Sequence, residues 1–188
     1  MEEQVRKDIL NVLNKGLKAI KEEDIASLRN LSNHTIHDAS IYQDDYSITI
    51  GIILYSISKI YERTNYREFK GWNFCNKCIL TFFPRAIKAL ENNNVEKYEK
   101  IVHDLFDTIY KLDPKLRSHI IDVFQEAKIH RASRLHEHGI SVGRVANILG
   151  LSEFEIMEYL GKTRISDVSF GITKDVKDRI NFTRGLFK

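Results

Sequence analysis

The sequence is poor in the residues that make tight turns. Only two of its 188 residues are proline and nine are glycine, whereas β-sandwiches and β-barrels need many turns built from these residues. A long apolar run is also missing, because the most apolar stretch, residues 48–57, is about half as long as a membrane span. Hydrophobic residues nonetheless make up 43% of the chain, enough to bury a core. These features favour an all-α protein that does not span a membrane.

The chain also lacks a strong charge and a cysteine framework. Its formal net charge is +3, which is too small to indicate nucleic-acid binding by itself. The only cysteines, Cys75 and Cys78, are expected to be free thiols in a reducing cytosol. The first residues are charged and do not form the apolar core of a signal peptide. We therefore expect a cytoplasmic location.

Apolar residues recur at helical spacing along most of the chain. The stripes cover residues 5–20, 25–31, 74–90, 95–112 and 116–135. Residues 48–61 are apolar nearly all round, which predicts a buried central helix, although their β-branched side chains leave a strand as an alternative. The polar segment 32–45 has no clear pattern, and Pro84 predicts a kink or restart in its helix. Short connections then predict an antiparallel helical bundle over residues 1–138.

A second pattern follows the bundle. Ser141 is placed to cap a short helix, and Gly150 can adopt the positive φ of a tight turn. Ser152 and Glu155 have the spacing of a capping box, which opens a second helix that we expect to end at Gly161. This arrangement predicts a helix-turn-helix.

The predicted helix-turn-helix occupies residues 139–161, and residues 162–188 form a basic tail. Three phenylalanines alternate with lysines and arginines in the tail, a pattern that suits docking on an acidic groove or a nucleic acid. The alternative is an extension whose phenylalanines pack on the bundle.

The strings Arg134–Ser141 and Ala146–Ser152, within residues 131–167, carry a family resemblance. They resemble a family of short prokaryotic antitoxins, in which a helix-turn-helix is joined to a C-terminal tail that masks a PIN-domain nuclease toxin. The resemblance covers about a fifth of the chain, and members of that family lack a bundle of this size. The helical body resembles uncharacterised archaeal proteins. The resemblance implies a non-enzymatic regulator with a nuclease toxin as its partner.

The charge of the second predicted helix bears on whether it reads DNA. A reading helix lies in the major groove beside two phosphate strands, but this one carries Glu153, Glu155 and Glu158, which repel phosphates. Basic residues of the preceding helices could still hold a DNA backbone. DNA and a protein are therefore alternative partners, and a homodimer is a further alternative. The candidate contact residues are Arg131, Arg134, Ser141, Arg144, Ser152, Glu153, Met157, Arg179 and Arg184.

A different class of function is suggested by Arg29 and His34, which are separated by four residues. Arg131 and His136 have the same spacing. This spacing resembles the active motif of helical HEPN ribonucleases and implies metal-independent RNA cleavage, in which His moves a proton and Arg stabilises the charged intermediate. A protein- or RNA-associated interaction scaffold, suggested by the basic tail, is a third alternative.

A metal site is a further alternative. His34 and His37 could bind zinc or iron together with Cys75 and Cys78, but nothing in the sequence brings the two pairs together. We expect the cysteines to be core thiols, the histidines to hydrogen-bond near helix ends, and the protein to use neither metal nor cofactor. The leading prediction is a non-catalytic cytoplasmic regulator with a helix-turn-helix, either a DNA-binding transcriptional regulator or an antitoxin-like protein.

Overall fold

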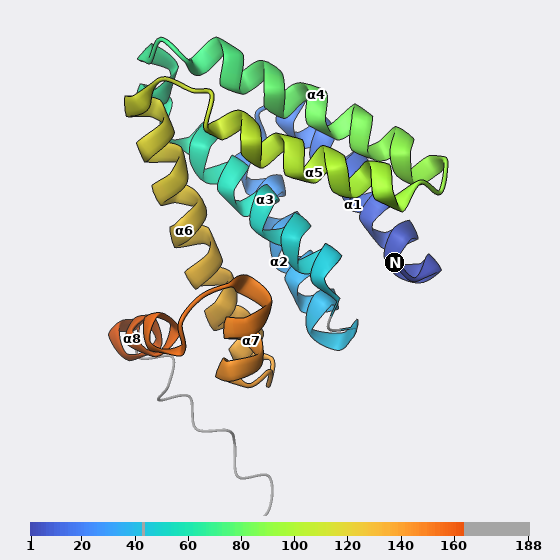
Figure 1. Ribbon diagram of the computed structural model, residues 1–188, viewed down its shortest axis with the longest axis vertical. Helices are drawn as coiled ribbons and strands as arrows, with labels where there is room; N and C mark the ends of the chain where they lie inside the picture. Colours follow the sequence, from blue (N-terminus) through green and yellow to red (C-terminus); the bar gives the residue numbers. More distant parts are fainter. Residues whose placement is uncertain (43, 164–188) are drawn as a thin grey trace, which may run out of the picture.

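The computed structural model describes residues 1–42 and 44–163, and Figure 1 shows their arrangement. These residues form eight α-helices and one 3₁₀-helix, without any strand. The elements are α1 (Glu3–Lys21), α2 (Ile25–Tyr42), α3 (Asp45–Glu62), η1 (Thr64–Glu68), α4 (Trp72–Glu91), α5 (Val95–Ile109), α6 (Pro114–Glu137), α7 (Val142–Leu149) and α8 (Glu153–Thr163). The predicted all-α bundle is confirmed. None of the described helices is both long enough and apolar enough to span a membrane.

Helix α3 is enclosed by the bundle because it is apolar on nearly every side. Between Ser47 and Tyr61 the side chains that are not buried are those of Thr49, Tyr55 and Lys59. Removing the other side chains from water stabilises the fold only if neighbouring helices cover them. The predicted central helix is therefore confirmed, and the strand alternative is wrong.

Helices α2 and α3 approach each other closely at Gly51. A Cβ atom added there would lie 2.7 Å from Cδ1 of Ile36, and the hydroxyl of Ser32 donates a hydrogen bond to the Gly51 carbonyl oxygen. This contact explains why residues 32–42 of the polar segment 32–45 are helical and belong to α2. The buried side of this segment includes small polar residues such as Ser32 and Thr35. Because they take positions that apolar residues usually occupy, the helical hydrophobic pattern is not visible in the sequence.

The remaining helices cover the bundle from several directions. Helix α1 packs on α2 and α4, α4 packs on α5, and α6 packs on α3. In Figure 1, α7 and α8 lie at the C-terminal end of α6, against which both of them pack. Asp113 caps α6 by accepting a hydrogen bond from the Leu116 backbone N–H at 3.2 Å. Helix α4 is continuous through Pro84, so the restart that was one of the two expectations there does not occur.

Replacing Gly51 with alanine should destabilise the protein by about 1–3 kcal/mol, because the added methyl group would overlap Ile36 in a filled interface. Gly161→Ala is the matched control in α8. None of the described atoms lies within 4 Å of a Cβ added at Gly161, and alanine favours a helix more than glycine does. This variant should gain up to about 1 kcal/mol. Urea denaturation measures both, and equal stability of Gly51→Ala and wild type would contradict the close contact.

Candidate functional site

Helices α7 and α8 are joined by a turn whose geometry follows from local sequence. The Ser141 hydroxyl accepts a hydrogen bond from the Arg144 backbone N–H at 3.3 Å, which caps α7. Gly150 has a φ of 61°, a left-handed conformation that glycine adopts without a steric penalty. Both local expectations are confirmed. Helix α6 packs against α7 and α8 and holds the pair beside the bundle.

A capping box opens α8. The Glu155 carboxylate accepts hydrogen bonds from the Ser152 backbone N–H at 2.8 Å and from the Ser152 hydroxyl at 2.7 Å. The Glu155 backbone N–H donates to the same hydroxyl at 3.2 Å. These bonds stabilise the ionised carboxylate and lower the pKa of Glu155. Helix α8 continues to Thr163, so the expected end at Gly161 is wrong.

The outward side of α8 combines apolar and acidic side chains. Phe154 is 75% exposed and Met157 is 54% exposed. Because they are three residues apart, they lie on the same side of the helix. Glu153 and Glu158 are exposed close to them in the helix, whereas Ile156 is fully buried. This side of α8 therefore offers an apolar centre with carboxylates at its edge.

Phe154 was not among the contact residues predicted from sequence. Its position around the helix could have identified it in the sequence. Phe154 is apolar, but it lies outside the apolar stripe formed by Ile156 and Leu160, which are buried. An apolar residue outside the stripe of a short amphipathic helix is a candidate for contact with another molecule.

Arg131 lies inside the protein, which corrects its prediction as a surface contact. The residue is 1% exposed, and its guanidinium carbon lies 4.1 Å from the ring centroid of Tyr55. Its Nη1 donates a hydrogen bond to Oδ1 of Asn33 at 2.6 Å. Burial lowers the pKa of Arg131 to about 10. A DNA phosphate therefore has no access to this guanidinium while the contacts are in place.

Tyr55 also stacks on His130. The two ring centroids are 4.8 Å apart and the ring planes differ by 17°. Burial, together with the positive charge of Arg131, lowers the pKa of His130 to about 4. Within the described part of the chain, Nδ1 of His130 has no hydrogen-bond partner. The imidazole is therefore neutral at pH 7, and it contributes packing instead of positive charge.

The other predicted contact residues are dispersed. Arg134 is exposed and pairs with Glu137 at 2.8 Å. Arg144 is exposed on α7 and borders a hollow formed with α1, α3 and α5. Arg179 and Arg184 lie outside the described residues. Among the three described arginines of the set, Arg131 is buried and Arg134 is ion-paired, so these three do not form one basic surface.

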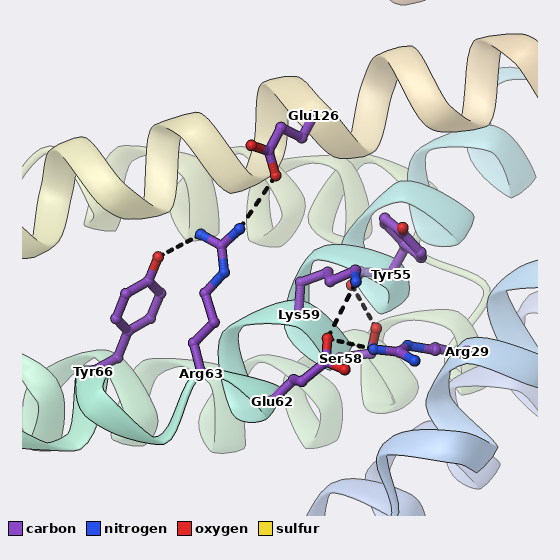
Figure 2. A network of polar contacts seen from close by, with 8 residues as sticks. All are labelled: Arg29, Tyr55, Ser58, Lys59, Glu62, Arg63, Tyr66 and Glu126. Carbon is purple, nitrogen blue, oxygen red and sulfur yellow. Dashed lines mark hydrogen bonds and ion pairs between the residues drawn. The ribbon is translucent and has the colours of Figure 1, made fainter. Parts of the chain in front are cut away.

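Arg29 and His34, the alternative catalytic pair, both lie on α2 but have different neighbours. Arg29 pairs with Glu62 of α3, which also pairs with Lys59 at 3.1 Å (Figure 2). His34 is exposed and borders a depression lined by α1, by α2 and by the turn between them. Five positions apart on a helix, the two side chains point about 140° away from each other. Within a single chain, the side chains of Arg29 and His34 are therefore not placed to contact the same phosphate group.

The network in Figure 2 connects helices and has a structural role. Arg63, which follows α3, donates to the Tyr66 hydroxyl at 2.6 Å and to the Glu126 carboxylate of α6 at 3.3 Å. These groups are partly exposed, so each ion pair contributes little stability by itself. The network links α3 to η1 and α6.

The residues considered for a metal site do not meet. No group of three or more His, Cys, Asp or Glu side chains with metal-binding geometry occurs in the described ranges. His34 and His37 are exposed within α2, not at a helix end as expected, and His37 packs edge-on against His138 at 5.0 Å. Cys75 and Cys78 lie on α4, where burial raises the pKa of Cys75 to about 12 and also raises the pKa of Cys78. Both cysteines therefore stay protonated at pH 7.

Comparison with known proteins gives no relative, because no family model, curated protein or solved structure matches the chain. The resemblances to antitoxins and to HEPN ribonucleases therefore stay predictions from short motifs. The function has to be argued from the geometry of this chain.

Acid should destabilise the protein through His130. The pKa of this side chain is about 6.5 in the unfolded chain and about 4 in the fold, so the unfolded chain binds a proton first as the pH falls. Its contribution to the free energy of unfolding should therefore drop by at most about 2 kcal/mol between pH 7.5 and pH 5, because solvent screens the exposed part of the ring. Urea denaturation at the two pH values measures the loss.

His130→Phe should remove this part of the acid response, because phenylalanine keeps the stacking on Tyr55 but binds no proton. His34→Gln changes an exposed histidine of α2 and should keep the wild-type response. An unchanged acid response in His130→Phe would show that His130 is protonated equally in the folded and unfolded states.

Proposed function

We propose that the protein is a non-catalytic regulator that binds a protein partner through α8. In this proposal, α7 and α8 form a helix-turn-helix that serves as a docking module. The resemblance to short antitoxins supports a nuclease as the partner, although in that family the C-terminal tail masks the toxin. The partner is a nuclease, and the outward side of α8 covers its basic nucleic-acid surface. The basic tail takes no part in this proposal, because residues 164–188 lie outside the described residues.

The observation that carries the proposal is the pairing of Phe154 and Met157 on the exposed side of α8. An aromatic ring and a methionine are typical of interface centres, where a partner's pocket removes them from water. Glu153 and Glu158 add carboxylates at the edge, although Glu158 also pairs with Lys162 at 2.6 Å. A complementary partner has an apolar pocket rimmed by lysine or arginine, a combination typical of nucleic-acid-binding surfaces.

The same geometry disfavours DNA as the occupant. A DNA duplex at α8 would place phosphates near Glu153 and Glu158, and carboxylates repel phosphates. Arg131 is buried and Arg134 pairs with Glu137. Two of the arginines expected to hold a DNA backbone are therefore committed to contacts within the protein.

The proposal can be tested in the cells that naturally produce the protein. Phe154 is replaced there with a photo-crosslinking benzophenone amino acid. Benzophenone is apolar and aromatic, so it preserves the character of this surface. We expect a protein adduct from position 154 and none from the same group at Ile41, which is 64% exposed on α2. A nuclease-sensitive adduct, or no adduct at all, would contradict the proposal.

The crosslinked protein, once identified and purified, allows a quantitative test. Phe154→Asp should weaken its binding roughly thirtyfold or more, as expected when an aromatic anchor is lost, and Ile41→Asp should leave binding unchanged. Glu153→Gln combined with Glu158→Gln should weaken partner binding and strengthen non-specific binding to duplex DNA at low salt. Fluorescence anisotropy measures both. Equal partner affinity of Phe154→Asp and Ile41→Asp would rule out docking through α8.

A further inference from the structure

A hollow of about 690 Å³ lies between α1, α3, α5 and α7. Its volume is in the range of small-molecule sites. The hollow is lined by apolar side chains that include Val5, Val102 and Phe106. It is also lined by four carboxylates, those of Glu2, Asp44, Asp45 and Glu99. The hollow thus combines an apolar surface with concentrated negative charge.

Two polar atoms of residues that line the hollow are buried without a hydrogen-bond partner in the described part of the chain. One is the hydroxyl oxygen of Tyr98, a residue that is 1% exposed. The other is Oδ2 of Asp44, whose Oδ1 caps α3 by accepting from the Ser47 backbone N–H at 2.8 Å. A buried polar atom without a partner destabilises the fold. Two such atoms at one hollow point to a ligand that bonds to both.

We infer that the hollow binds an aliphatic polyamine, with one ammonium group held by Asp44 and Tyr98. An ammonium group donates up to three hydrogen bonds, and the carboxylate and hydroxyl oxygens are both acceptors. The methylene chain packs on Val102 and Phe106, and a second ammonium group pairs with Glu99. This site is separate from the outward side of α8 that carries the proposed function.

The charges around the hollow favour a polycation over other small molecules. The four carboxylates are opposed by two full positive charges on lining residues, the guanidinium of Arg144 and the α-ammonium group of Met1, and by His103, which itself pairs with Asp107 at 3.2 Å. Tyr46 donates a hydrogen bond to Glu99 at 2.6 Å, which orients that carboxylate without neutralising it. Burial raises the pKa of Tyr98, so its hydroxyl stays neutral and does not add a charge of its own. A hollow with one dominant sign of charge concentrates ligands of the opposite sign.

Isothermal titration calorimetry of the full chain with spermidine at low salt tests the inference. Tyr98→Phe removes only the hydroxyl, so the unliganded fold should be equally stable or more stable, while spermidine affinity should fall roughly fivefold. Asp44→Asn keeps an effective capping side chain for α3 but removes its charge, and affinity should fall roughly tenfold or more. Asp122→Asn removes an exposed carboxylate of α6 outside the hollow and should leave affinity unchanged.

A competition with magnesium ions at constant ionic strength separates this site from general charge attraction, because Mg²⁺ cannot use the apolar wall. We expect Mg²⁺ to displace spermidine poorly. Four results would each overturn the inference: no binding of spermidine by the wild type, unchanged affinity in Tyr98→Phe, an equal loss in Asp122→Asn, or full displacement by Mg²⁺.

Discussion

Isoleucine and leucine side chains point outward from α3 in many directions, so this helix is stable only where other helices cover it. Ile48, Ile50, Ile53 and Leu54 are fully buried, and α1, α2 and α6 all pack on the helix. Gly51 lets α2 approach closely enough to complete the cover. Two polar features of the protein involve α3 and its N-cap. Tyr55 stacks on Arg131 and His130, whereas Asp44 caps the first turn and lines the hollow.

Helix α6 extends this arrangement from the bundle to α7 and α8, because it packs on α3 and on both of the later helices. Arg131 lies at this transition, bonded to Asn33 of α2 and stacked on Tyr55 of α3. A buried cation without a carboxylate partner is costly, and the hydrogen bond and the cation–π contact offset part of that cost. Arg131 therefore helps to hold the surface of α8 in a defined place relative to the bundle.

The features that the sequence predicts well are those determined within about four residues. Asp113, Ser141 and Gly150 end or begin helices through contacts with their near neighbours, and the pair Ser152 and Glu155 does the same. Their side-chain chemistry and spacing are sufficient, because no distant part of the chain takes part.

The features that the sequence does not predict depend on distant partners. The polar half of α2 is helical because Ser32 and its neighbours are covered by α3, which periodicity in one segment cannot reveal. Arg131 resembles a surface cation until Asn33, 98 positions away, is placed beside it. The spacing of Arg29 and His34 fits a catalytic motif, but a helix directs the two side chains to different sides. Motif spacing is informative only when the backbone conformation between the residues is known.

The charge of the protein is divided between residues 1–163 and the residues that follow. Residues 164–188 hold six basic and three acidic side chains, which accounts for the whole net charge of +3 and leaves the preceding part formally neutral. Within that neutral part, carboxylates gather on the outward side of α8 and around the hollow. Arg144 belongs to α7 and also borders the hollow, so a bound polycation would repel its guanidinium.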